Sequence, residues 1–198
     1  IRYMGAGAMV VGGLWSIFGM RRGIQAGLRE VMKLLMKRGG EEKAEPTGED
    51  LPIRVILPLA VVLIAGVFAL YWYFTGSFLV AMVSAYVMVV AGFLFVAVSS
   101  YIVGLVGSSN NPVSGMTMFT LLIASLLLLA LGATGKTGMI GALVVAGVVC
   151  CAACAAGDMS QDLKTGHIVG ATPRRQQIGQ LLGVLVASFV TTPVLILL

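Results

Sequence analysis

The chain has 198 residues, of which 59% are hydrophobic and 11% are charged, and its net charge is +5. Its mean hydropathy is +1.01. A soluble domain carries far more charge, because it must cover its surface with polar groups, so the composition excludes an ordinary soluble protein. Residues 55–135 contain no Asp, Glu, Lys or Arg. This run is long enough for three crossings of a hydrocarbon core about 30 Å thick. The sequence therefore predicts an all-α, polytopic transmembrane helical bundle.

The first part of the chain is predicted to cross the membrane once and then to follow its surface. Residues 1–22 include an apolar, glycine-rich stretch and form a predicted transmembrane segment. In residues 23–52, Arg29, Lys33 and Lys37 recur on one helical face and apolar side chains on another, which indicates a cytoplasmic amphipathic helix followed by a polar linker. We expect residues 53–198 to be a portion of a larger helical bundle, because both ends of the chain lie beside apolar segments.

Five further membrane segments are expected after the linker, which gives about six in all. Their predicted limits are residues 53–74, 78–106, 116–131, 139–157 and 178–198. The second of these five is longer than a single crossing requires, so we expect a tilt or a break near Gly92. Tyr71, Trp72 and Tyr73 predict an aromatic belt at the outer membrane surface.

The distribution of basic residues predicts the orientation of the chain. Residues 21–54 hold eight of the thirteen Lys and Arg, and residues 158–177 hold three. Residues 75–77 hold none, and residues 133–138 hold one. Cytoplasmic loops of membrane proteins carry an excess of Lys and Arg. Residues 21–54 and 158–177 are therefore predicted to be cytoplasmic, in the plasma or inner membrane, and the same distribution argues against a nucleic acid as partner.

The first polar motif of the bundle is GSSNNPVSGMT, residues 107–117. Asn110 and Asn111 are costly to leave without partners in lipid. Pro112 has no N–H, and Gly107 and Gly115 tolerate unusual backbone angles. The pattern indicates a broken or re-entrant helix, whose exposed backbone groups bind an ion or a substrate. An ordinary cytoplasmic turn is the alternative, because Asn-Pro is a common turn pair, and the spacing alone favours neither.

The second polar motif is GDMSQDLKTG, residues 157–166. If the preceding helix continues through it, Asp158 and Asp162 share one face, and Gln161 and Thr165 lie close to that face. Two carboxylates in such a position form a proton-accepting site for ion-coupled transport. The alternative is a solvated cytoplasmic loop with no role beyond topology.

Two further titratable residues accompany this motif. Lys164 is expected to neutralise one of the carboxylates. His167 titrates nearest to neutral pH and is a candidate for a proton relay, although for His167 alone we favour a residue without function.

No enzyme, cofactor or metal centre is expected. Cys150 and Cys154 lie on one helical face among alanine and valine, where cysteines are mostly small packing residues. A metal site needs three or four ligands with ordered support. No nucleophile with a neighbouring base is present in the sequence either.

Residues 104–117, GLVGSSNNPVSGMT, and residues 156–183, AGDMSQDLKTGHIVGATPRRQQIGQLLG, together resemble the oligopeptide transporter family, and in particular its prokaryotic and yellow-stripe-like branch. The residues that correspond to the family motifs are Asn110, Asn111, Pro112, Ser114, Gly115 and Thr117 in the first segment, and Gly157, Asp158, Gln161, Asp162, Lys164, Thr165 and Gly166 in the second.

The resemblance implies a secondary active transporter, usually coupled to protons, that imports small peptides or metal-chelate complexes. Its expected partners are the lipid bilayer, the substrate and the remaining helices of a longer transporter, and a homo-oligomer is left open. We expect alternating access around a polar midplane site, where Asn110 and Asn111 contact substrate or ion and Asp158 or Asp162 takes part in coupling. The alternatives are a channel-like pore with a re-entrant segment and a membrane module that transports nothing.

Overall fold

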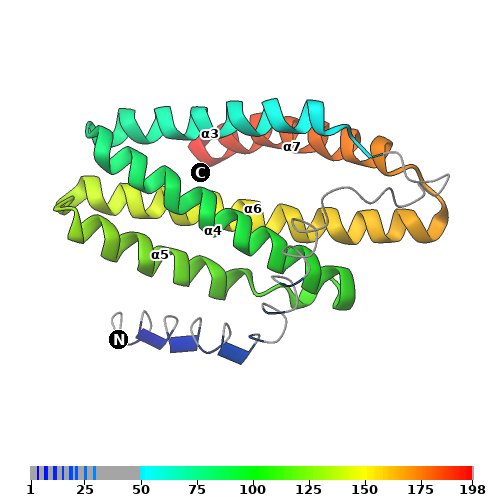
Figure 1. The fold of residues 1–198 in the computed structure, drawn as a ribbon, viewed down its shortest axis with the longest axis horizontal. Coiled ribbons are helices and arrows are strands. Elements are labelled where there is room, and N and C mark those ends of the chain that lie inside the picture. Colours follow the sequence, from blue (N-terminus) through cyan, green and yellow to red (C-terminus); the bar gives the residue numbers. More distant parts are fainter. Residues whose placement is uncertain are drawn as a thin grey trace.

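The computed structural model describes residues 50–197 continuously, together with isolated positions between residues 4 and 29. Within residues 50–197 it has five α-helices and no strand, and each helix is long and apolar enough to cross a membrane (Figure 1). The helices are α3 (Ile53–Thr75), α4 (Phe78–Val106), α5 (Val113–Ala130), α6 (Gly135–Val169) and α7 (Pro173–Leu197), and the 3-10 turn η1 (Ser108–Asn110) lies between α4 and α5. The all-α membrane fold is confirmed, while the predictions for residues 1–22 and most of 23–52 lie outside the described residues.

Successive helices run in opposite directions, so the connections gather at two ends of the bundle (Figure 1). The start of α3, the α4–α5 connection and the α6–α7 turn lie at one end, and the α3–α4 and α5–α6 turns lie at the other. At the first end, the side chain of Gln177 accepts a hydrogen bond from Leu51 N at 2.9 Å and donates one to Asp50 Oδ1 at 3.0 Å. This contact joins the two basic stretches that the charge pattern assigns to the cytoplasm, so we call this end the cytoplasmic end.

The core lies between α4, α5 and α6, and α6 packs most extensively on α4. Small side chains fill much of it, including Ala81, Ala85, Ala142, Ala146 and Ala153, all of which are buried. Small residues let helix backbones approach closely, which is how membrane helices gain packing energy in the absence of a hydrophobic drive from lipid. The fold thus holds α4 and α6 close together, and α4 leads directly into the first polar motif while α6 carries the second.

The predicted helix limits differ from the structure mainly in α6. The segment was expected to end at residue 157, but α6 continues to Val169 and ends at Gly170, whose φ of 78° allows the closing bond from Ala171 N to Gly166 O at 2.8 Å. The second motif is therefore helical, and the prediction of a solvated loop there is wrong. Polar residues do not end a helix when that part of it extends beyond the hydrocarbon.

Two smaller expectations also need correction. α4 is continuous through Gly92, so the alternative of a break at that position is wrong. Tyr71 is only 1% exposed and belongs to the core, whereas Trp72 and Tyr73 are exposed. The outer end of α3 therefore presents two of the three predicted belt aromatics, because helical spacing turns the third into the core.

Gly107 ends α4 and fixes the course of the chain toward α5. Its φ is 91° and its ψ is 163°, a backbone region that is essentially restricted to glycine. Its N–H still bonds to Val103 O at 2.9 Å, so the last turn of α4 is complete before the chain leaves the helix.

We expect Gly107→Ala to lower the thermal stability of the purified protein, because alanine at this backbone conformation costs roughly 1–3 kcal/mol. The measurement is the melting temperature in detergent. Gly104→Ala is the matched control, because Gly104 lies within α4 and a Cβ there would meet nothing within 4 Å. Equal melting temperatures for the two variants would contradict the role assigned to Gly107.

Candidate functional site

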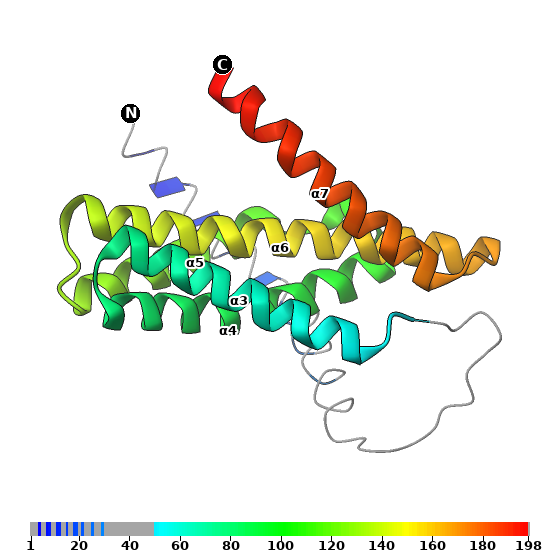
Figure 2. The same cartoon turned by 90° about the horizontal axis from the view of Figure 1, so that it is seen from above.

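The two polar motifs, which are about fifty residues apart in sequence, meet at the cytoplasmic end of the bundle. The backbone N–H of Ser108, in the α4–α5 connection, donates a hydrogen bond to Gln161 Oε1 of α6 at 2.8 Å. The possible break in the first motif takes the form of a turn: α4 ends, η1 follows, and α5 returns along the bundle (Figure 2). A side chain of the second motif thus satisfies a backbone group of the first.

A second contact lies deeper, at the carbonyl oxygen of Ala153 in α6. Ser99 Oγ of α4 donates to this oxygen at 2.6 Å, and Asn111 Nδ2 donates to it at 3.3 Å. In an α-helix the same oxygen also accepts the bond from the N–H four residues later, that of Gly157. Ser99 is 0% exposed. One carbonyl therefore gathers donors from α4, from the connection and from α6 itself.

Gly157 provides the space for this arrangement. A Cβ built on Gly157 would lie 2.5 Å from Asn111 Nδ2, 3.1 Å from Ser99 Oγ and 3.2 Å from Val103 Cγ2. Any larger residue would push Asn111 away from α6. The amide oxygen of Asn111 is buried and accepts no hydrogen bond from the described residues. Asn111 thus uses only its donor half in the contact with α6.

Within the described residues, the other side chains of the first motif form no hydrogen bond with α6. Asn110 is exposed and bonds to Val106 O of its own turn at 3.3 Å. Pro112 caps α5, accepting a bond from Met116 N, and Thr117 Oγ1 bonds to Val113 O within α5. Ser114 is exposed. Gly115 is buried inside α5 with ordinary helical angles, so of the two glycines of this motif only Gly107 adopts a positive φ.

The second motif presents its charged side chains to solvent. Asp158 and Asp162 are both exposed and lie four residues apart on α6, as the helical alternative predicts. Within the described residues, Lys164 forms no ion pair with either carboxylate, so the structure gives no support to the expected neutralisation. Thr165 Oγ1 bonds to Gln161 O at 3.0 Å. His167 is exposed at the last turn of α6.

Glutamines at the start of α7 complete the site, and the sequence reasoning missed them. Gln180 Nε2 donates to Asp162 Oδ2 at 3.3 Å, and Gln176 Nε2 lies 3.5 Å from Asp162 O. The carboxamide of Gln176 also covers Gly166, which is buried beneath it. The i, i+4 spacing of Gln176 and Gln180 at the start of a helix was the available signal. Ser99, one of three serines in a helix without charged residues, was a second missed signal.

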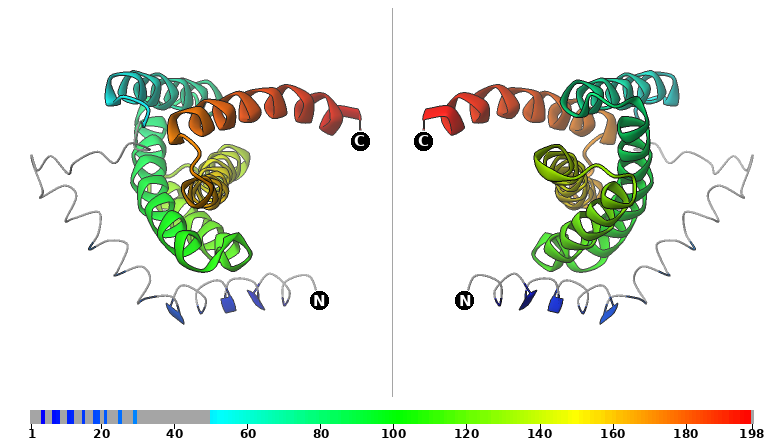
Figure 3. Two further views of the ribbon diagram at one scale, coloured as in Figure 1. Left: turned by 90° about the vertical axis from the view of Figure 1, so that its right-hand side faces the viewer. Right: turned by 90° about the vertical axis from the view of Figure 1, so that its left-hand side faces the viewer.

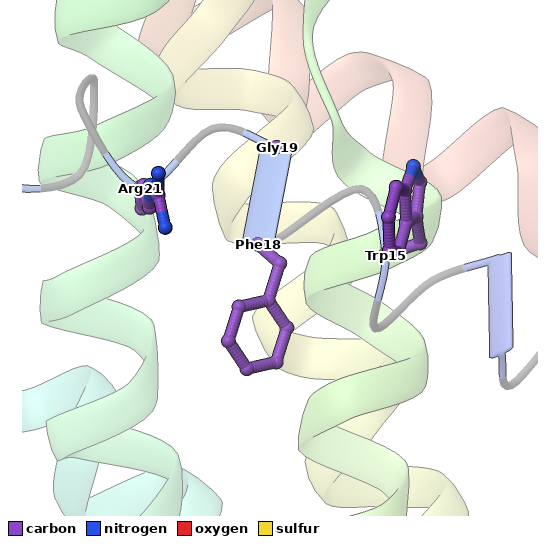
Figure 4. Close-up of a pocket in the computed structure, with 4 residues that line it drawn as sticks. All are labelled: Trp15, Phe18, Gly19 and Arg21. Carbon is purple, nitrogen blue, oxygen red and sulfur yellow. The ribbon is translucent and has the colours of Figure 1, made fainter.

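Neither a pocket at the N-terminal segment nor a metal cluster offers a competing site. A cavity of about 660 Å³ is lined by Trp15, Phe18, Gly19 and Arg21, with Trp15 and Phe18 strongly exposed (Figure 4). Substrate sites combine apolar walls with several convergent polar groups, and the described lining offers one charged residue. Among the described residues, no group of three His, Cys, Asp or Glu side chains is placed to hold a metal ion.

We expect Gly157→Ala to separate the α4–α5 connection from α6 and to lower the melting temperature, because overpacking typically costs roughly 1–3 kcal/mol. Gly92→Ala is the control, since Gly92 lies within the neighbouring helix α4 and a Cβ there meets nothing within 4 Å. Adding Asn111→Ala to Gly157→Ala should restore part of the loss, because the blocked side chain is then absent. Strictly additive effects of the two changes would show that this contact is not the cause.

Comparison with known proteins places the chain in a family. All of residues 1–198 match the family model described as OPT oligopeptide transporter protein. A "Putative oligopeptide transporter" from Haemophilus influenzae is 30% identical over 213 residues, which cover 98% of this chain and 33% of that protein. Another from Saccharomyces cerevisiae is 38% identical over 73 residues, which cover 37% of this chain and 10% of that protein.

The chain thus spans about a third of the length of the Haemophilus influenzae relative. No solved structure matches it. The resemblance carried by the two motifs is confirmed over the whole chain, and the span-length helices make it an integral membrane protein of the lipid bilayer. The chain belongs to the OPT oligopeptide transporter family.

Proposed function

We propose that this chain is part of a secondary active transporter that imports oligopeptides or metal-chelate complexes, coupled to protons, by alternating access. The observation that carries the proposal is the meeting of the two motifs, in which Ser108 N–H bonds to Gln161 and Asn111 bonds to the Ala153 carbonyl. The names of both relatives refer to oligopeptide transport. The metal-chelate alternative comes from the resemblance of the two motifs to the yellow-stripe-like branch.

The position of this contact favours a gate at the cytoplasmic end. Ala153 lies 18 residues after Gly135, the first residue of α6, which corresponds to about 27 Å along the helix. A hydrocarbon core is about 30 Å thick. The α4–α5 connection therefore contacts α6 close to the cytoplasmic edge of the membrane rather than at its midplane.

The bonds at this contact suit a gate because they are few and are made by side chains. When the connection leaves α6, the bonds from Ser108 to Gln161 and from Asn111 to Ala153 break, while the backbone bonds of α4, α5 and α6 stay intact. The buried amide oxygen of Asn111 then becomes accessible to donor groups of a substrate, such as peptide N–H groups, whereas the Ala153 carbonyl keeps its bonds from Ser99 and from its own helix.

Asp158 and Asp162 are the proposed coupling residues. Both are exposed at the cytoplasmic end, on the helix that the connection contacts. Asp162 also accepts a bond from Gln180 of α7. A change in its protonation therefore alters the contact between α6 and α7, which is the kind of link that coupling requires.

The first test is proton-driven uptake by the full-length protein in proteoliposomes. We expect Asp158→Asn or Asp162→Asn to reduce uptake driven by a proton gradient, because an amide does not bind a proton at neutral pH. Asp50→Asn is the control, since Asp50 is an exposed carboxylate at the same end that also accepts a bond from a glutamine of α7 but lies outside both motifs. Uptake that survives in both motif variants would exclude the coupling role, and single-channel currents in place of saturable uptake would indicate a pore.

The second test separates the two neighbouring asparagines of the first motif. We expect Asn111→Ala to reduce uptake of a labelled oligopeptide several-fold, because it removes the contact with the Ala153 carbonyl. Asn110→Ala should retain uptake, since Asn110 is exposed and bonds only within its own turn. Equal losses in both variants would contradict the assignment of the gate to Asn111.

A further inference from the structure

α7 belongs to the bundle only at its cytoplasmic end. Among the described helices it packs on α6 alone, and it diverges from α6 toward its C-terminal end (Figures 2 and 3). No residue of α7 is buried, although the helix is long and apolar enough to cross a membrane. The central helices α4 and α6, in contrast, are each packed against several others. The greater part of α7 therefore has no helical neighbour within residues 50–197.

The face of α7 that begins on α6 continues with small residues. Gln176 and Gln180 contact α6, and Gly183 and Ala187 follow them at spacings of three and four residues, which places all four on one helical face. Gly183 and Ala187 are exposed, and a Cβ built on Gly183 would meet nothing within 4 Å. The contact made by the glutamines is thus not continued along the helix.

An uncovered face of α6 begins at the same place. Asp162, which bonds to Gln180, shares a helical face with Cys151 and Gly147, and all three are exposed. A Cβ on Gly147 would also meet nothing within 4 Å. Beyond the Asp162–Gln180 bond, the α6 face carries the exposed Asp158 and then the small residues Cys151 and Gly147, the α7 face carries Gly183 and Ala187, and the two faces diverge.

We propose that a transmembrane helix from the remaining part of the full-length transporter packs between these two faces, against Gly147 and Cys151 of α6 and Gly183 and Ala187 of α7. The chain covers 33% of the Haemophilus influenzae relative, so a transporter of that length has further helices to supply the partner. Small residues at four-residue spacing allow close approach of helix backbones. In a membrane, the van der Waals packing of such contacts stabilises helix association, because lipid supplies no hydrophobic driving force between helices. Residues 147–151 and 183–187 carry no charge, and Asp158 lies nearer the cytoplasmic end of the same α6 face, so the part of the partner that contacts these small residues is apolar.

Photo-crosslinking in the full-length transporter tests this proposal without reference to transport. The native cysteines are replaced by serine, Gly183→Cys is introduced, and the new thiol is labelled with a benzophenone maleimide in membranes. After irradiation and digestion, mass spectrometry identifies the crosslinked peptides. We expect peptides from outside residues 1–198. Ala187→Cys, on the same face, repeats the measurement if Gly183→Cys lowers the yield of folded protein.

Leu185→Cys is the matched control. Leu185 is exposed and lies two residues from Gly183, on the opposite side of α7, so it should give several-fold less crosslinking to protein and mainly adducts with lipid. Lipid adducts alone from position 183 would overturn the proposal. Crosslinks from position 183 to residues of α6, or to a second copy of the same segment, would also overturn it, because they would show that α6 or a homo-oligomer covers this face.

Discussion

The constraint on which the rest of this structure depends is that backbone groups released from a helix near the membrane need hydrogen-bond partners. The chain leaves helical order between Val106 and Val113, and α6 provides partners at two levels of this connection. Gln161 accepts the bond from Ser108 N–H near the surface, and the Ala153 carbonyl accepts bonds from Asn111 and Ser99 below it. The absence of a side chain at Gly157 is what permits this close approach. The conformation of Gly107, the placement of Asn111 and the packing of α4 on α6 are therefore parts of one arrangement.

This arrangement relates two motifs that carry different chemistry. The first motif supplies two asparagine amides and a helix start that is capped by proline. The second supplies two carboxylates and Gln161, which accepts the bond from Ser108 of the first motif. The glutamines of α7 extend the same network, since Gln180 bonds to Asp162 and Gln177 bonds to the segment that enters α3. Side-chain amides dominate these contacts. Amides donate and accept in fixed geometry without carrying charge, so such contacts form and separate without the cost of desolvating an ion pair.

The sequence predicted the fold well where composition controls the structure, and less well where contacts between distant residues control it. The limits of α4 followed from an apolar run bounded by Ser77 and Gly107, and the placement of the chain before α3 and of the α6–α7 turn at one end of the bundle followed from the distribution of Lys and Arg. The end of α6 was misplaced because the charged residues after Gly157 resemble a loop, although Asp158 and Asp162 already had helical spacing. Tyr71 was assigned to the surface because aromatic belts are a general tendency, while its burial depends on how α3 packs on α4 and α6. The bonds of Ser99 and Gln180 depend on which helices are neighbours, and neither hydropathy nor local spacing contains that information.

The length of α6 has a mechanical consequence. Its 35 residues correspond to about 52 Å, so a helix that fills a core of about 30 Å still extends some 20 Å beyond it. That extension is a rigid arm whose outer part carries Asp162, Lys164 and His167. A small tilt of α6 within the bundle is amplified along the arm into a larger sideways displacement of these groups, while the contact at Ala153, nearer the pivot, moves little. A small rearrangement of α6 inside the membrane therefore produces a larger movement of these side chains in water. An antibody directed at the arm would detect that movement.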